Sequence, residues 1–256
     1  MITSLSNPLV RRVSLLNKKA SLRKEEGLFV VEGRRFAEEI PADRLEQAFA
    51  SEAFLETEEG ASLARRLRAE TVSEAVMEKM SDTRTPQGIL ALVRMQETPP
   101  EAWGPGPLLL LERVQDPGNL GTIFRIAEAA GAGGIILDEE TADPYSPKVL
   151  RSTMGGIFRV PFRTVPRIGD EVKRLQREGV RVYAAHLQGS SEFDRVTYPP
   201  RCAFLLGNEG SGLTDEVSAL ADERVRIPME GRAESLNVAV AGALLLYEAY
   251  RQRRNG

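Results

Sequence analysis

The chain beyond residue 107 alternates short apolar runs with helical segments, and this alternation constrains the fold more than any other feature. Leu108-Leu-Leu-Leu, Gly134-Ile-Ile-Leu and Cys202-Ala-Phe-Leu-Leu are continuous apolar runs. Such runs are typical of strands buried on both faces, because a strand with one wet face alternates polar and apolar residues. Further strands are expected at 180–185 and 225–228, and helices at 118–130, 170–178, 214–221 and 236–254. The pattern predicts an α/β fold with a parallel sheet covered by helices.

A weaker alternation precedes it and predicts a small second α/β domain over residues 27–95. Its strands are expected at 28–31, 45–50 and 88–93, and its helices at 34–39, 63–69 and 73–80. Residues 96–107 are rich in Pro and Gly and are interpreted as a linker. Trp103 in this linker is expected to pack against a domain face, with base stacking as the alternative. The predicted organisation is a basic helix or arm at 1–26, the small domain, the linker and a larger domain at 108–256.

The charge distribution indicates where a polyanion could bind. The net charge of −3 argues weakly against a nucleic-acid partner, but residues 11–35 carry eight basic side chains against three acidic ones. One interpretation is a solvated helix face, and the other is a phosphate-binding surface. The candidate RNA-binding residues are Arg11, Arg12, Lys18, Lys19, Arg34 and Arg35.

Several features of the sequence indicate the cellular compartment of the protein. No run of about 18 apolar residues occurs, and the N-terminus lacks the basic-then-apolar layout of a signal peptide. A single Cys excludes an intrachain disulfide, and one Cys with one His makes no zinc site within the chain. We therefore expect a soluble cytoplasmic protein without a membrane or metal partner.

Ligands of parallel sheets bind beyond the carboxyl ends of the strands, which directs attention to four loops. The first runs into the helix at 118–130, where Asn119 lies near the helix start and Arg125 lies off the apolar stripe. A capped helix with a surface arginine would explain both residues equally. The stretch has neither the G-x-G-x-x-G nor the Gly-Lys-Ser/Thr pattern of the common phosphate-binding loops. The other loops lie at 185–191, 207–213 and 228–237.

The third and fourth loops, at 207–213 and 228–237, contain further candidate site residues. Gly207-Asn-Glu-Gly-Ser-Gly212 is either a tight turn or a place where a ligand approaches the main chain, and Glu209 is its only carboxylate. Ser235 and Asn237 straddle the expected start of the last helix, so that one of them is its predicted N-cap. Gly242 and several alanines make that helix thin, so that another segment can approach it closely.

Three stretches together resemble the motifs of the SpoU (TrmH) family of RNA ribose methyltransferases. They are Asn119-Leu-Gly-Thr-Ile-Phe-Arg125, Leu206-Gly-Asn-Glu-Gly-Ser-Gly-Leu213, and Ile227-Pro-Met with Glu234-Ser-Leu-Asn-Val-Ala-Val-Ala241, in this order. Residues 27–93 resemble the domain like ribosomal protein L30e that many members carry. The resemblance implies the SPOUT fold, in which the C-terminal segment of an α/β domain is threaded into a deep trefoil knot. It also implies S-adenosylmethionine as cofactor, bound by Leu206, Gly207, Gly210, Ile227, Met229 and Leu236.

The implied reaction is 2′-O-methylation of a ribose in structured RNA. The resemblance points to Arg125 as the residue that meets the target phosphate and hydroxyl, supported by Asn119, Glu209, Ser235 and Asn237. His186 is a possible base by residue type, but it lies outside the motifs and is interpreted as structural. Ribosomal RNA is the expected substrate and transfer RNA the alternative. A non-catalytic ribosome-assembly factor and a base methyltransferase of the same superfamily are the competing classes. The resemblance also implies a homodimer through the larger domain, and the last helix supports it, because this helix is apolar all round between Val238 and Leu246.

Overall fold

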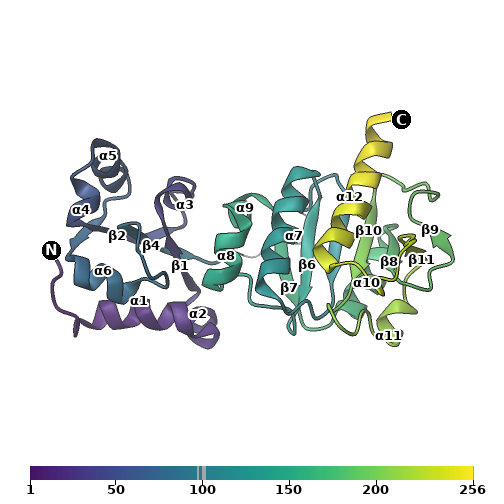
Figure 1. The fold of residues 1–256 in the computed structure, drawn as a ribbon, viewed down its shortest axis with the longest axis horizontal. Helices are drawn as coiled ribbons and strands as arrows, with labels where there is room; N and C mark the ends of the chain where they lie inside the picture. Colours follow the sequence, from purple (N-terminus) through teal and green to yellow (C-terminus); the bar gives the residue numbers. More distant parts are fainter. Residues whose placement is uncertain (97, 100–101, 256) are drawn as a thin grey trace. The chain divides into compact units, whose positions relative to one another are not determined.

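The computed structural model describes residues 1–96, 98–99 and 102–255, which form two compact units (Figure 1). The first unit contains residues Met1–Gln96 and Tyr145–Phe158, and the second contains Glu97–Pro144 and Arg159–Gly256. Residues Tyr145–Phe158 were expected within the larger domain but group with the first unit, where the Tyr145 ring lies 4.6 Å from that of Phe29. No helix in the described part of the chain is long and apolar enough to cross a membrane.

The first unit is built on a four-stranded sheet in the order β1-β4-β2-β3, in which only β2 and β3 are parallel. Asn7 caps the first helix and Pro8 occupies its first turn, where its missing N–H group is not needed. The elements are α1 Pro8–Lys18, α2 Ala20–Glu26, β1 Leu28–Glu32, α3 Arg34–Glu38, β2 Leu45–Ser51, α4 Glu52–Leu55, α5 Glu58–Arg66, β3 Glu70–Val72, α6 Glu74–Met80, β4 Ile89–Arg94 and α8 Pro147–Thr153. Helix α9, Gly156–Arg159, ends at the boundary between the units.

The N-terminal basic segment is part of this unit and not a separate arm. Val10, Val13 and Leu16 on α1 are fully buried in the core of the unit. Arg23, counted from the sequence among the surface cations, is buried and donates to the carbonyl oxygens of Leu16 and Asn17. Its guanidinium satisfies the end of α1, so it is not available to a partner.

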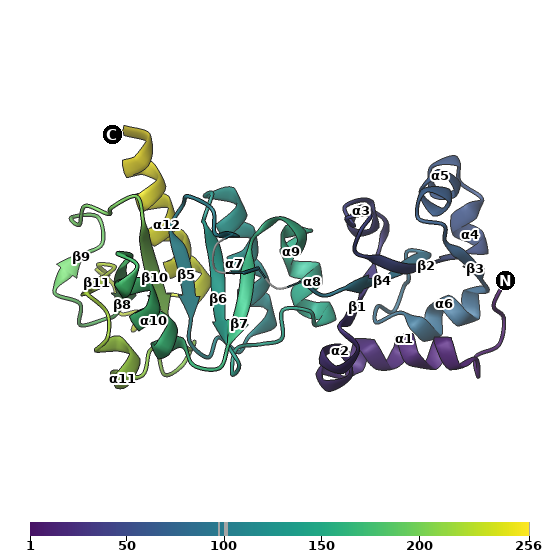
Figure 2. The same cartoon turned by 180° about the vertical axis from the view of Figure 1, so that it is seen from behind.

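The second unit is a seven-stranded sheet in which every pairing is parallel, confirming the predicted α/β fold. The strand order is β7-β6-β5-β10-β8-β11-β9, with β5 and β10 adjacent near its centre. Helices α7 and α12 cover one face and α10 covers the other (Figures 1 and 2). The elements are β5 Leu108–Leu111, α7 Pro117–Ala129, β6 Gly134–Asp138, β7 Phe162–Val165, α10 Ile168–Arg177, β8 Arg181–Ala185, β9 Ser191–Glu192, β10 Cys202–Leu206, α11 Asp215–Ser218, β11 Glu223–Arg226 and α12 Val238–Asn255.

The two central strands explain the apolar runs. All residues of β5 and β10 are buried, and Leu110 pairs with Leu205 in register. Alternate side chains point to opposite faces, so Leu110 and Leu205 pack toward α10, in one cluster with Val172. On the other face α12 lies against β10, where a Cβ at Gly242 would come within 2.9 Å of Leu206 Cδ1. The helix α12 can approach β10 this closely because Gly242 has no side chain.

Candidate functional site

The site lies beyond the carboxyl ends of β5, β10 and β11, where three loops meet. The first loop leads into α7, whose N-cap is Asp116, with a side chain that accepts a hydrogen bond from Asn119 N at 2.8 Å. Pro117 then supplies the first helical position. Because Asp116 caps the helix, the side chain of Asn119 is left for other contacts.

The second loop is the glycine-rich turn after β10. Asn208 and Gly212 exchange main-chain hydrogen bonds, and Asn208 Oδ1 accepts from the main-chain nitrogens of Gly210 and Ser211 at 3.0 and 3.1 Å. Gly212 has a φ of 69°, which favours glycine. At Gly207 a Cβ would lie 2.2 Å from Leu213 N, so this position admits no side chain. The turn is closed on itself and exposes several main-chain groups.

Glu209 joins this turn to the first loop. Its carboxylate accepts hydrogen bonds from the main-chain nitrogens of Gln115 and Asp116 at 3.1 and 3.0 Å, and from Asn119 Nδ2 at 3.0 Å. Partial burial by itself would raise the pKa of Glu209, but the hydrogen bonds from Asn119 and the main chain outweigh it and hold the pKa below its ordinary value. The group is therefore an ionised acceptor that holds two loops together.

Asn237 extends the same network to the third loop. Its Oδ1 accepts from the main-chain nitrogens of Ala239 and Val240 at 2.9 and 3.3 Å, which makes it the N-cap of α12. Its Nδ2 donates to Asn119 Oδ1 at 2.7 Å. A continuous chain Glu209–Asn119–Asn237 thus connects all three predicted motifs. Ser235 is exposed and makes no hydrogen bond with any residue the structure describes, so Asn237 alone is the cap.

Arg125 lies outside this network. It is exposed on α7, six residues after Asn119 and so roughly 9 Å further along the helix axis. The apolar stripe of the helix faces the other way, where Ile123, Phe124 and Ala127 are buried. Within the described chain the guanidinium of Arg125 has no hydrogen-bond or ion-pair partner. It is a free cation beside a site that is otherwise hydrogen-bonded.

A pocket of about 530 Å³ lies between the turn after β10 and the loop before α12. A volume of this size suits a small ligand or cofactor. All six residues predicted to bind a cofactor line it: Leu206, Gly207, Gly210, Ile227, Met229 and Leu236.

The pocket also contains residues that the sequence did not assign to it. His186 follows β8, and its Nδ1 accepts a hydrogen bond from Gln188 N at 3.1 Å. Arg224 on β11 is the arginine of the lining. His186 lies directly after β8, in the loop at 185–191 that the sequence had already singled out. Arg224 is the second residue of β11, and no predicted loop included it.

The candidate RNA-binding residues lie on the first unit and differ in their availability. Arg12 pairs with Glu26 at 2.7 Å, and Arg34 pairs with Glu38 at 2.9 Å and also with Glu59. The others are exposed and form no ion pair with a described residue; they are Arg11, Lys18, Lys19 and Arg35.

Fold and site together define an α/β protein with a cofactor-sized pocket beside a polar network at the carboxyl edge of its sheet. The chain belongs to the SpoU rRNA methylase family, whose model matches residues 107–247. Residues 7–91 match the MRM3-like substrate binding domain.

Individual relatives cover nearly the whole chain. The 23S rRNA (guanosine(2553)-2′-O)-methyltransferase RlmP of Bacillus subtilis is 34% identical over 96% of this chain and 97% of its own. An AdoMet-bound rRNA methyltransferase from Sinorhizobium meliloti superposes with a TM-score of 0.84 at 33% identity, over 98% of this chain and 97% of that one. AviRb from Streptomyces viridochromogenes, in complex with AdoMet, gives 0.87 at 28% identity, over 98% and 99%.

Proposed function

We propose that this protein transfers a methyl group from S-adenosylmethionine to a ribose 2′-hydroxyl of ribosomal RNA. The observation that carries the proposal is the meeting of the cofactor-sized pocket with the Glu209–Asn119–Asn237 network. The names of the relatives support it, because they describe 23S rRNA 2′-O-methyltransferases and AdoMet-bound structures. Incubation with labelled cofactor and ribosomal RNA tests the proposal, and a methyl group on the ribose is the expected product.

The pocket suits the cofactor on chemical grounds. Leu206, Ile227, Met229 and Leu236 offer apolar surface to a purine ring, while the turn at 207–212 offers main-chain groups. S-adenosylmethionine, when bound, supplies an electrophilic methyl group on a sulfonium centre. Knotted threading of the last segment, as in the SPOUT fold, would bring these loops together, and the close approach of α12 to Leu206 supports it.

The remaining requirements of the reaction are met by side chains of the protein. A ribose hydroxyl is a poor nucleophile, so it must be oriented toward the methyl group and its developing charge must be stabilised. Arg125 carries a guanidinium without a partner among the described residues, and its planar fork of donors suits it to hold a phosphate and the hydroxyl oxygen. Asn119 and Asn237 fix the floor on which the ribose lies. RNA is the natural substrate, because only RNA offers a 2′-hydroxyl.

A non-catalytic role is less well supported, because a protein that had lost its activity would not need the complete Glu209–Asn119–Asn237 network. Residence in the cytoplasm agrees with the proposed substrate.

Glu209→Gln should lower both turnover and cofactor affinity. Gln115 N donates to one carboxylate oxygen and Asp116 N to the other, and an amide would replace one of these oxygens by an N–H group, leaving at least one donor unpaired at a cost of about 1–3 kcal/mol. Thermal unfolding and calorimetric titration with S-adenosylhomocysteine measure the two effects, with the exposed Glu230→Gln as matched control.

The pH dependence of the stability of the same variant follows from the direction in which the pKa of Glu209 is shifted. The lowered pKa of Glu209 gives a stability contribution that is complete above the ordinary carboxyl pKa of about 4.3 and is lost as pH falls through the lower folded value. The stability difference between wild type and Glu209→Gln should therefore be flat from pH 6 to 8. A difference that fades between pH 8 and 6 would contradict this role.

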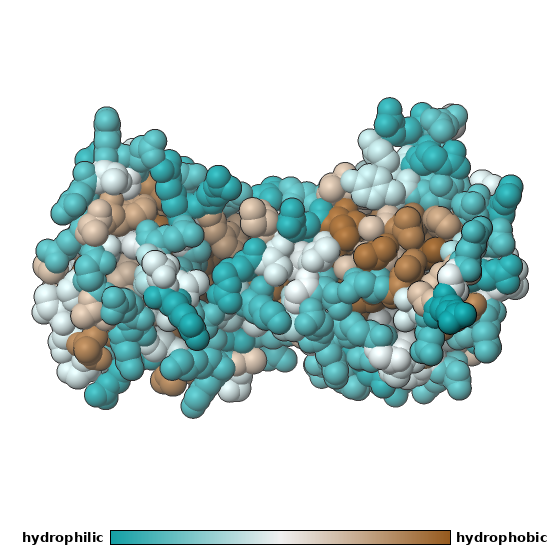
Figure 3. Space-filling model, in the orientation of Figure 1, coloured by the Kyte–Doolittle hydropathy of each residue, from teal (hydrophilic) through white to brown (hydrophobic). Residues whose placement is uncertain are grey.

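A homodimer through α12 is part of the proposal. Val240 and Tyr247 on this helix are 47% and 46% exposed, and Figure 3 shows apolar side chains gathered over α7 and α12. Exposed apolar clusters of this kind mark interaction surfaces. Val240→Glu combined with Tyr247→Glu should convert a dimer into a monomer by light scattering at micromolar concentration. Leu15→Glu, at an exposed apolar residue of α1, should leave the mass unchanged; a monomeric wild type would refute the dimer.

The unpaired cations of the first unit are proposed to hold the RNA. Lys18→Ala with Lys19→Ala should weaken RNA binding and lower the slope of log affinity against log salt by about 0.7–0.9 for each phosphate that is no longer neutralised. The exposed Lys173→Ala in the second unit is the control, and cofactor affinity should stay constant in both. An unchanged salt slope in the double variant would place the RNA elsewhere.

A further inference from the structure

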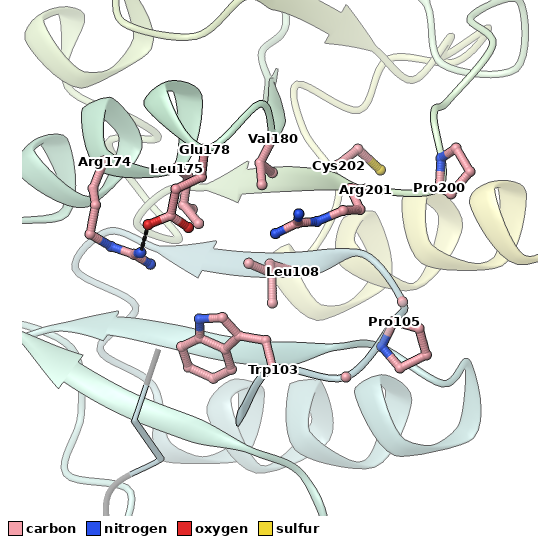
Figure 4. Close-up of a pocket in the computed structure, with 12 residues that line it drawn as sticks. Trp103, Pro105, Leu108, Arg174, Leu175, Glu178, Val180, Pro200, Arg201 and Cys202 are labelled. Carbon is pink, nitrogen blue, oxygen red and sulfur yellow. Dashed lines mark hydrogen bonds and ion pairs between the residues drawn. The ribbon is translucent and has the colours of Figure 1, made fainter. Parts of the chain in front are cut away.

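A second cavity lies in the same unit, at the opposite edge of the sheet. It has a volume of about 710 Å³ and is lined by Leu108 and Cys202, the first residues of β5 and β10, and by Val180, directly before β8 (Figure 4). Because β10 is parallel to its neighbours and is five residues long, roughly 16 Å of sheet separates this edge from the glycine-rich turn. The cavity is thus distinct from the proposed cofactor pocket.

Trp103 forms part of the floor of this cavity and is held firmly. Gly104 N donates to Gly133 O at 2.8 Å, which ties the segment before β5 to the chain before β6. A Cβ at Gly134 would lie 2.4 Å from Cε3 of Trp103, so the indole packs directly on the glycine backbone. The packing expected from the sequence is confirmed. In Figure 4 the indole lies beside Leu108, so that the two side chains give the cavity an apolar floor.

Two arginines line the cavity from different parts of the chain, Arg174 on α10 and Arg201 directly before β10 (Figure 4). The guanidinium of a third, Arg163, lies 5.8 Å from the centre of the Trp103 ring and is paired with Glu171. Arg174 is neutralised by Glu171 at 2.6 Å and by Glu178. Arg201 is exposed and makes no hydrogen bond or ion pair with any residue in the described ranges. The cavity therefore presents one uncompensated cation above an apolar surface.

An unsatisfied donor lies at the same place. Trp103 Nε1 is buried and has no acceptor among the described residues. A buried donor without an acceptor costs free energy, but this atom is closed off from the cavity, so a ligand there does not reach it. The cavity itself offers a flat apolar floor and a free guanidinium.

We propose that this cavity binds a nucleotide, with the phosphate on Arg201 and the base against Trp103 and Leu108. A guanidinium pairs with phosphate through charge-assisted hydrogen bonds, and aromatic surfaces bind bases. An apolar ligand would leave the arginine unsatisfied, and phosphate alone would leave the floor uncovered. The nucleotide is either a free mononucleotide or one residue of an RNA strand, and only the second case rests on the proposed function.

The chain itself provides the probe, because Trp103 is its only tryptophan. Indole fluorescence is followed while guanosine or uridine monophosphate is added to the full-length protein saturated with S-adenosylhomocysteine, which keeps the cofactor pocket closed to them. Free N-acetyltryptophanamide corrects for absorption by the nucleotide. We expect a saturable change in emission, and inorganic phosphate alone should produce none at the same concentrations.

Arg201→Gln should weaken nucleotide binding about tenfold or more, the size of one charge-assisted contact, and Arg201→Lys should recover part of it. Arg177→Gln on the exposed face of α10 is the matched control and should bind as the wild type does. Circular dichroism and S-adenosylhomocysteine affinity report on folding and on the cofactor pocket separately. A linear change in emission, or equal binding by Arg201→Gln, would overturn the proposal.

The source of the nucleotide is decided by competition. If ribosomal RNA fragments displace the mononucleotide from the wild type and bind more weakly to Arg201→Gln, the cavity holds a residue of the RNA. If RNA and mononucleotide bind together, the cavity takes a free nucleotide. Both results support a nucleotide site, and failure of methyl transfer alone would leave the fluorescence result intact.

Discussion

Arg125→Ala should reduce single-turnover methylation by on the order of 100-fold or more, the usual effect of removing a transition-state contact. Arg125→Lys should fall nearly as far, because an ammonium cannot make the paired contacts of a planar guanidinium. The affinity for S-adenosylhomocysteine should barely change, since Arg125 is absent from the lining of the 530 Å³ pocket. Stability should also be preserved, because the side chain is exposed and makes no hydrogen bond or ion pair with a described residue.

The matched control is Arg177→Ala, an exposed arginine on the helix that covers the other face of the sheet. It should methylate at the wild-type rate. Normal turnover of Arg125→Ala would instead identify it as an ordinary surface residue of a capped helix, with effects within about 0.5 kcal/mol. Glu209 is then a poor replacement as base, because its carboxylate already accepts four N–H groups.

Gly207→Ala adds a single methyl group, and it should be the most damaging substitution of this size in the site. The new Cβ would lie 2.2 Å from Leu213 N and 2.3 Å from Gly212 C, and main-chain atoms cannot turn aside as a side chain can. The turn must therefore open, which disrupts the pocket wall and the position of Glu209. We expect cofactor binding to fall below detection and the melting temperature to drop by several degrees.

Gly210→Ala in the same turn is the control for this effect. Its Cβ would be 3.6 Å from Asn208 Oδ1, which is ordinary contact, and φ there does not require glycine. Calorimetric titration with S-adenosylhomocysteine compares the two variants. Equal affinity for Gly207→Ala and Gly210→Ala would show that the turn does not form the wall of the cofactor pocket.

The sheet of the second unit was predictable where strands are buried on both faces, as in β5 and β10. The edge strands were not predicted, because burial no longer dictates their residues. Strand β7 carries Arg163 and Thr164 between Phe162 and Val165, and β9 has two residues only. The grouping of Tyr145–Phe158 with the first unit was equally hidden, since it rests on ring packing with Phe29 from a distant part of the sequence.

The candidate site was predicted as three motifs, but the bonds that join them were not. Asn119 and Asn237 are 118 positions apart, and no spacing rule connects them. The sequence also left open whether Asn119 or another residue caps α7; Asp116 does so, and this frees the amide for Glu209 and Asn237. Arg12 looks like a free cation in the sequence because its partner Glu26 lies on the next helix. Arg34 has one distant partner, Glu59, but its other partner, Glu38, lies at the i+4 position of the same helix and could have been inferred from the sequence.

The most direct test of the proposed activity is the fate of the transferred methyl group. Ribosomal RNA is incubated with methyl-labelled S-adenosylmethionine and the protein, then digested completely with alkali, which cleaves only where the 2′-hydroxyl is free. We predict label in an alkali-resistant dinucleotide with the wild type, and very little label with Arg125→Ala. Label recovered in mononucleotides would contradict ribose methylation and indicate a base methyltransferase, and no label at all would favour a non-catalytic RNA-binding protein.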